Sequence, residues 1–243
     1  MKWPHFTDIL FLKQCIICKT RGDAICCATC LSRIPVSTAP PAKWLSDPDS
    51  GKHFCYFAAS ADYENKTVKT LIHALKFDFI KSAAEPLGAL LTSYTLRYIS
   101  QFRTENSFLN NFFTGNANIV PIPLSKKRER HRGFNQSELI ARHFARNFAR
   151  HFGRSMDIPV RNDVLLRIRH TKPQSETTSA EERREHMHGC FSAKIPPSNI
   201  ILIDDVATTG STLREAAIAL RAAGAEKILA FAVASVPLTA ESI

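Results

Sequence analysis

The stretch NIILIDDVATTGSTLREA, residues 199–216, places two carboxylates at the end of an apolar run. Residues 200–203 predict a buried strand, and Asp204 and Asp205 follow it directly. Open α/β sheets bind their ligands at the carboxyl ends of their strands, which is where the two acids are expected to lie. The apolar spacing that follows predicts a helix over residues 211–223, on Leu213, Ala216, Ala217 and Leu220.

The turn between this strand and this helix predicts a receptor for a phosphate group. Unpaired backbone N–H groups and the positive end of the helix dipole converge there, and Gly210 lets the backbone approach a ligand closely. Two carboxylates would repel a neighbouring phosphate unless another group lay between them. A ribose meets that need, because its hydroxyls can donate hydrogen bonds to Asp204 and Asp205. The stretch therefore favours a ribose 5-phosphate moiety over the alternative, in which the acids only cap turns or pair with arginine.

Positive charge is concentrated in one segment of the chain. The net charge is +10, and residues 126–154 hold nine lysines and arginines against two acids. Such a concentration suggests an anionic partner, which could be phosphate, pyrophosphate or nucleic acid. Within it, arginines recur every fourth residue, offset from phenylalanines, so that a helix would bury the rings and expose the charges. A solvated face and a stripe that contacts nucleic acid both fit Arg142, Arg146, Arg150 and Arg154.

The N-terminal cysteines have the spacing of a metal site. Five of the seven cysteines lie between residues 15 and 30, where CIIC and CATC form two CxxC pairs. Thiolates so spaced can close a tetrahedron around a structural zinc ion, whereas a redox pair is the alternative. The expected ligands are Cys15, Cys18, Cys27 and Cys30, and Cys26 could replace Cys27.

The rest of the chain predicts one α/β domain behind this cysteine module. Residues 1–36 form the zinc-binding module, residues 37–54 read as a proline-rich linker, and residues 55–243 alternate strands with helices. Such alternation predicts a mostly parallel sheet flanked by helices, with a basic loop after the strand at 117–124. No apolar run approaches the ~20 residues of a membrane span, so we expect a cytoplasmic protein without membrane insertion.

Two segments resemble a known family. ILIDDVATTGSTL resembles the signature for 5-phosphoribosyl-1-pyrophosphate (PRPP) in type I phosphoribosyltransferases. IVPIPLSKKRERHRGFNQSELIA, residues 119–141, is similar to a segment of the ComF/GntX family of competence-related proteins, whose members also carry an N-terminal CxxC pair. The resemblance extends over nearly the whole chain. Residues 174–186, QSETTSAEERREH, depart from the family pattern.

The resemblance implies a transferase fold that binds PRPP with Mg²⁺ and releases pyrophosphate when a nucleophile attacks C1′. Asp204 and Asp205 would hold the ribose 2′- and 3′-hydroxyls. Arg128 and Arg132, with Arg130 and Lys76 as further candidates, would face the pyrophosphate. The 5′-phosphate would be wrapped by Ala207, Thr208, Thr209, Gly210, Ser211 and Thr212. The alternative is a non-enzymatic accessory of DNA uptake that uses the fold to bind phosphate, single-stranded DNA or competence proteins.

Overall fold

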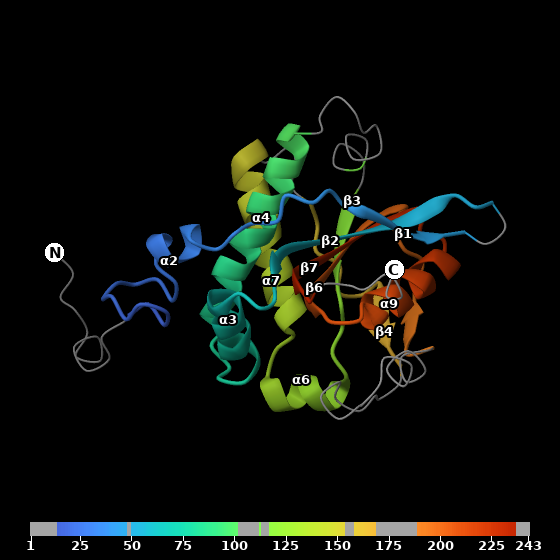
Figure 1. Ribbon diagram of the computed structural model, residues 1–243. Coiled ribbons are helices and arrows are strands. Elements are labelled where there is room, and N and C mark those ends of the chain that lie inside the picture. Colours follow the sequence, from blue (N-terminus) through green and yellow to red (C-terminus); the bar gives the residue numbers. More distant parts are fainter. Residues whose placement is uncertain are drawn as a thin grey trace.

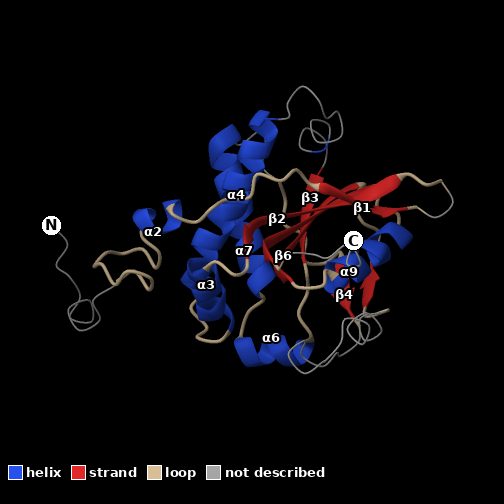
Figure 2. Ribbon diagram, viewed as in Figure 1, coloured by secondary structure: helices blue, strands red, loops and turns tan. Residues whose placement is uncertain are grey.

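A five-stranded sheet forms the centre of the molecule (Figures 1 and 2). The computed structural model describes residues 14–47, 50–101, 112, 117–153, 158–168 and 189–236. The strand order is β1-β2-β7-β6-β3, in which β1 is antiparallel to β2 and the other neighbours are parallel. This confirms the predicted mostly parallel sheet. The strands are β1 (Ala42–Ser46), β2 (His53–Asp62), β3 (Ala117–Pro121), β6 (Asn199–Ala207) and β7 (Lys227–Ser235).

Helices cover both faces of the sheet (Figure 1). On one face lie α3 (Lys66–Lys76), the short η1 (Lys81–Ala83), α4 (Ala84–Gln101) and α7 (Gln136–Phe152). The other face carries α9 (Ser211–Ala222) and a two-stranded sheet of β4 (Leu165–Arg167) and β5 (Phe191–Ala193). Each face has its own apolar cluster, so the buried strands β6 and β7 contribute side chains to both.

The helix α7 packs closely against α4. Phe144 and Phe148 are fully buried, as their spacing predicts. At the crossing, a Cβ atom added at Gly88 would lie 2.6 Å from the Cβ atom of His143. Only glycine permits this approach, since real Cβ atoms do not come so near to other atoms. The contact fixes the middle of α7 on α4.

The segment expected as a linker contributes a strand. β1 pairs with the first half of β2, and its register shifts between Lys43 and Leu45. That irregularity lets two successive side chains, Trp44 and Leu45, both be buried in the apolar cluster beside α9. Pro40 and Pro41, two of the prolines that suggested a linker, precede the strand, where no ladder hydrogen bond is required of them.

The basic loop expected after β3 is a short helix, α6 (Lys126–Arg132). Ser125 is its N-cap and accepts a hydrogen bond from the backbone N–H of Arg128 at 3.4 Å. Gly133 ends the helix in a left-handed conformation, with φ of 75°. A capping serine and a terminal glycine therefore mark the two ends of this seven-residue helix.

The cysteine module packs against the main domain beside α3 (Figure 1). It contains a short helix, α2 (Ala28–Ser32), and an isolated antiparallel bridge between Gln14 and Arg21. Its residues Cys15, Cys30 and Ile34 belong to the same apolar cluster as α3 and α4. Among the residues that the structure describes, no helix has both the length and the apolar character that crossing a membrane requires.

Candidate functional site

The paired acids lie at the carboxyl end of β6 and are buried. Asp204 is 7% exposed and Asp205 is 3% exposed. One oxygen of Asp204, Oδ1, accepts hydrogen bonds from the Ser137 hydroxyl at 3.0 Å and from the backbone N–H of Asp205 at 2.9 Å. Ser137 lies in the first turn of α7, and sequence reasoning missed its role because the contact joins segments far apart in the chain.

Burial perturbs the first of the two acids. Desolvation, followed by the negative charge of the neighbouring Asp205, raises the pKa of Asp204 to about 7. The charge of Lys76 and the two hydrogen bonds to the carboxylate act in the opposite direction. A carboxyl group with this pKa exchanges its proton near neutrality, so a ligand that donates to it or brings positive charge favours its ionised form.

The second acid pairs with the last residue of α3. Lys76 Nζ lies 2.8 Å from Asp205 Oδ1, and its side chain is 22% exposed. The same oxygen accepts a hydrogen bond from the backbone N–H of Val206 at 2.7 Å. Asp205 Oδ2 is buried and makes no hydrogen bond with any residue that the structure describes. The structure therefore brings Lys76, a weak candidate from the sequence, into direct contact with the acids.

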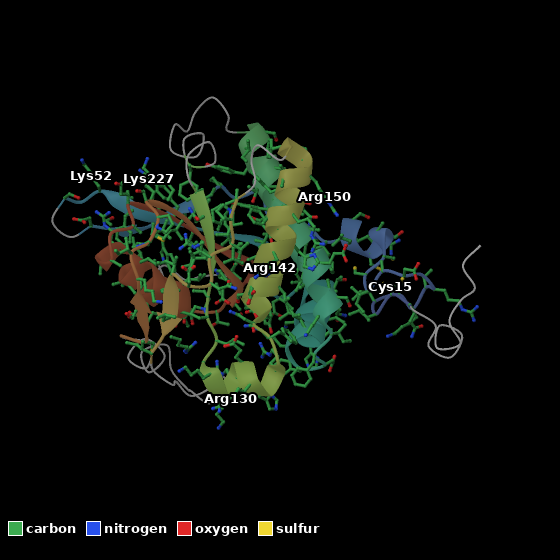
Figure 3. The ribbon with its side chains drawn as sticks, turned by 180° about the vertical axis from the view of Figure 1, so that it is seen from behind. Cys15, Lys52, Arg130, Arg142, Arg150 and Lys227 are labelled. Carbon is green, nitrogen blue, oxygen red and sulfur yellow. The ribbon has the colours of Figure 1, made fainter. Side chains whose placement is uncertain are left out.

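Arginines from α6 and β4 lie within electrostatic reach of the same carboxylates. Burial lowers the pKa of Arg132. The negative charge of Asp205 raises this pKa, and the positive charge of Arg128 lowers it further. Arg132 therefore lies within electrostatic reach of both Asp205 and Arg128. Arg132 also donates to Gln136. Arg128 Nη2 is buried without a hydrogen-bond partner in the described part of the chain. Arg130, by contrast, extends from α6 away from the body of the molecule (Figure 3).

A further arginine, Arg167 of β4, joins this group. Burial has the largest influence on the pKa of Arg167 and lowers it. The charge of Arg128 lowers this pKa further, whereas the charges of Cys190 and Asp204 raise it. Its guanidinium lies 5.4 Å from the centre of the Phe191 ring in β5. Sequence reasoning missed this residue, although an arginine inside the apolar run DVLLRI was a signal that it was held in place rather than solvated.

The predicted phosphate turn leads from β6 into α9. Gly210 is the N-cap of α9, with φ of 71°, and the cap has no side-chain hydrogen bond. Thr209 Oγ1 donates to Ser211 Oγ at 3.0 Å and accepts from the backbone N–H of Ser211 at 3.4 Å. One small cavity joins the turn to the first acid, because its lining includes Asp204, Thr208, Gly210 and Thr212.

Two details of this turn differ from the sequence prediction. Ala207 is the last residue of β6 and is buried in the apolar cluster beside α9, so only its backbone can face a ligand. Thr212 and Glu215 have the sequence spacing of a capping box, which would make Thr212 the N-cap. The N-cap is instead Gly210, two residues earlier, and Glu215 Oε2 accepts a hydrogen bond from the backbone N–H of Gly189 at 3.1 Å.

The four expected cysteine ligands lie together. The sulfur atoms of Cys15, Cys18, Cys27 and Cys30 are within 4.8 Å of one another. Four thiolates at such separations can hold one tetrahedral metal ion. Cys26 is outside the group, and its thiol faces the carbonyl of Cys27 at 3.8 Å. The structure thus groups Cys27, and not Cys26, with the other three.

The outer face of α7 carries the arginine row. Arg142, Arg146 and Arg150 line a groove of about 1070 Å³, whose other wall includes residues 158–160 (Figure 3 labels Arg142 and Arg150). Arg142 also pairs with Glu138 at 2.7 Å, and Arg146 contacts the Nδ1 atom of His143 at 3.1 Å. Arg154, the fourth member of the predicted row, and residues 174–186 lie outside the described residues.

Comparison with known proteins agrees with this architecture. The family model for the phosphoribosyl transferase domain matches residues 137–241, which include α7, β6, the turn and α9. Competence protein F of Haemophilus influenzae is 36% identical over 115 residues, which are 45% of this chain and about half, 46%, of that protein. Competence protein ComFC of Bacillus subtilis is 36% identical over 99 residues, 41% of this chain and 36% of that protein.

One relative is similar over most of both chains. The DNA utilization protein YhgH of Escherichia coli K12 is 29% identical over 218 residues, which are 88% of this chain and 86% of that protein. The similarity therefore extends well beyond the residues that the family model matches. The parallel sheet, the acids at the end of β6 and the four grouped thiols agree with the similarity of this chain to these competence and DNA utilization proteins, and residues 137–241 form a phosphoribosyl transferase domain.

Proposed function

We propose that the chain binds PRPP together with Mg²⁺ and transfers the phosphoribosyl group to an acceptor nucleophile, with release of pyrophosphate. The observation that carries the proposal is that Asp204 and the first turn of α9 line the same small hollow. A ligand bound over this hollow would meet hydrogen-bond acceptors on one side and a helix N-terminus on the other. A sugar hydroxyl suits the first and a phosphate group suits the second.

The carboxylates are suited to a ribose. Asp205 Oδ2 is buried without a partner among the described residues, and an unsatisfied buried oxygen of this kind costs free energy that a donor from a ligand would recover. Ribose hydroxyls are such donors. Ser137 and the backbone of β6 hold the Asp204 carboxylate in place, so it need not reorganise when a hydroxyl binds.

The cations around the acids are suited to the leaving group. In the transfer, the lone pair of the nucleophile forms a bond to C1′ while the bond from C1′ to the pyrophosphate oxygen breaks, and that electron pair leaves with pyrophosphate. Arg128, Arg132 and Lys76 offer positive charge to the departing group. Mg²⁺, when bound with PRPP, would add further positive charge for the leaving group. The acids beside the sugar favour the positive charge that develops at C1′.

Calorimetric titration with PRPP in the presence of Mg²⁺ tests the binding. We expect the double substitution Asp204→Asn with Asp205→Asn to weaken binding more than about 100-fold, since it removes charged hydrogen bonds to two hydroxyls. Arg130→Gln is the matched control, because Arg130 lies on α6 but points outward, and should bind as the wild type does. Absence of heat for the wild-type protein would refute the proposal. Release of pyrophosphate with nucleobases and small amines as acceptors tests turnover.

We also propose that the cysteine module holds a structural zinc ion. The chain acts, in this proposal, in the reducing cytoplasm. The separation of its four thiols supports a closed tetrahedral site with no open position for catalysis. Metal analysis of purified protein should give one zinc per chain. Cys27→Ser should lose the metal, whereas Cys26→Ser, one residue away and outside the group, should retain it. Equal metal content in the two variants would contradict this ligand set.

A second function, binding of single-stranded DNA, is favoured by the groove on α7. Its row of arginines is positively charged, and relatives of the chain are named for competence and DNA utilization. Contacts to phosphates predict affinity that falls steeply with salt. Fluorescence anisotropy with a labelled oligonucleotide at two salt concentrations tests this. Arg150→Gln should weaken binding a few-fold and reduce the salt dependence, and unchanged affinity would argue against the groove.

A further inference from the structure

The hollow beside the acids is too small for a sugar. Asp204 and the first turn of α9 line it, and its volume is about 10 Å³, which is the space that one water molecule needs. Asp205, the neighbouring acid, is only 3% exposed. A ribose whose hydroxyls donate to these acids can therefore bind only if a side chain that covers them moves.

Lys76 is the side chain in contact with the second acid. Its Nζ atom lies 2.8 Å from Asp205 Oδ1, and its side chain is 22% exposed whereas that of Asp205 is 4% exposed. The ammonium group is thus the outer member of the pair. Lys76 is the last residue of α3, and the residue that follows it, Phe77, is 61% exposed. Because a lysine charge sits on a flexible stem of four carbons, it can leave Asp205 without movement of the helix.

The groups around the acids carry more positive than negative charge. Four cations lie within electrostatic reach of the two acids or of one another, and they are Lys76, Arg128, Arg132 and Arg167. Burial also raises the pKa of Asp204 to about 7, so this acid offers less than a full negative charge near neutrality. The surplus favours a ligand with more than one anionic group.

The ion pair distinguishes between two kinds of sugar phosphate. When ribose 5-phosphate binds, its hydroxyls must take Asp205 from Lys76, and the ammonium group is left without an anion in a partly buried place, which costs free energy. A ribose that also carries a diphosphate on C1 brings a new anion close by, because C1 adjoins C2, whose hydroxyl is a donor to the acids. Lys76 then exchanges one anionic partner for another.

We propose that Lys76 is a specificity-determining residue of this site, which selects a sugar that carries both a 5-phosphate and a diphosphate on C1. In the free protein its ammonium group covers Asp205, and it leaves the acid for the diphosphate of the ligand. The inference rests on the proposed function, since it takes the acids as the ribose site. It adds the reason why a sugar with a single phosphate binds poorly, and it requires no transfer reaction.

Lys76→Met tests this role, because it should change two affinities in opposite directions. Without the ammonium group, ribose 5-phosphate meets an uncovered carboxylate and should bind about tenfold more tightly. Pyrophosphate loses a charged partner and should bind about tenfold more weakly. Calorimetry on the folded variant, in buffer without added Mg²⁺, measures both affinities.

Lys69→Met is the matched control. Lys69 lies on the same helix and pairs at 2.7 Å with an exposed acid, Glu64, so this variant should bind both ligands as the wild type does. A merely structural role of Lys76 would weaken both ligands together. A Lys76→Met protein that binds both more weakly, or both with wild-type affinity, would therefore overturn the inference.

The wild-type protein gives a second test, which decides if Lys76→Met does not fold. Pyrophosphate that draws Lys76 away uncovers Asp205, so saturating pyrophosphate should tighten the binding of ribose 5-phosphate about tenfold. Unchanged or weaker binding would mean that the inference is wrong, and the proposed function would stand as long as PRPP binds. If neither PRPP nor pyrophosphate binds the wild type, the proposed function fails and the inference fails with it.

Discussion

Lys76 with Asp205, at the end of the sheet, and Arg142 with Glu138, on α7, are ion pairs of nearly equal length, 2.8 and 2.7 Å. Their surroundings differ. The side chains of the first pair are 22% and 4% exposed, and those of the second are 55% and 26% exposed. Water screens the second pair and can replace either partner, whereas the buried acid of the first pair has no such substitute. The energetic role of these charges is therefore set by burial and not by distance.

Removal of Lys76 should have the largest effect. Lys76→Met leaves the Asp205 carboxylate buried without its cation, and we expect a loss of about 3 kcal/mol in the free energy of unfolding at pH 8. Urea unfolding measures it. Lys69→Met is the control, because Lys69 lies on the same helix and pairs at 2.7 Å with an exposed acid, Glu64. Adding Asp205→Asn to Lys76→Met should restore most of the loss, and failure to do so would mean that the two residues are not energetically coupled.

Asp204→Asn should have the next largest effect, with the opposite sign. The pKa of Asp204 is raised from 3.8 to about 7 in the folded protein, so the folded state holds the proton more tightly than the unfolded state does. This group therefore costs stability as the pH rises from about 4 to about 7. Asparagine can still accept the hydrogen bonds of Ser137 and Asp205 without the charge. The variant should exceed the wild type by more than about 1 kcal/mol at pH 8, and the gap should close near pH 4. A gap independent of pH would contradict the shifted pKa.

Breaking the exposed pair should change least. Arg142→Gln should alter the free energy of unfolding by less than about 0.5 kcal/mol, because water already solvates both groups. The same urea titration used for Lys76→Met makes the comparison direct. A loss as large as that of Lys76→Met would show that burial is not what distinguishes the two regions.

Much of the fold follows from local patterns in the sequence. The apolar run at 199–206, the helix that follows it and the phenylalanine spacing of α7 predict those elements with nearly the observed bounds. The short elements contain too few residues to show the apolar periodicity that predicts a strand or a helix. β5 has three residues and was not predicted, and α6 was predicted as a loop although Ser125 and Gly133 mark its ends. In β1 the register shift buries adjacent side chains, which hides the alternation of a strand.

The part of the candidate site that comes from one continuous segment was predictable from the sequence. The contacts between segments far apart in the chain were not. The acids and the turn lie within nine residues, 204–212, so their arrangement follows from a strand that leads into a helix. Ser137, Arg167 and the ion pair of Lys76 come from other elements and depend on how helices pack on the sheet. The orphaned atoms Asp205 Oδ2 and Arg128 Nη2 are likewise a consequence of packing, and a sequence does not reveal them.

The crossing of α7 over α4 has a mechanical consequence. α7 is 17 residues long, about 25 Å at 1.5 Å per residue. It touches the carboxylates through Ser137 at its first turn and carries the basic groove along the remainder. Gly88 and His143 meet between the two, where α7 and α4 approach each other closely. A tilt of α7 about this contact would move Arg150 and Ser137 in opposite directions, as the two arms of a lever do.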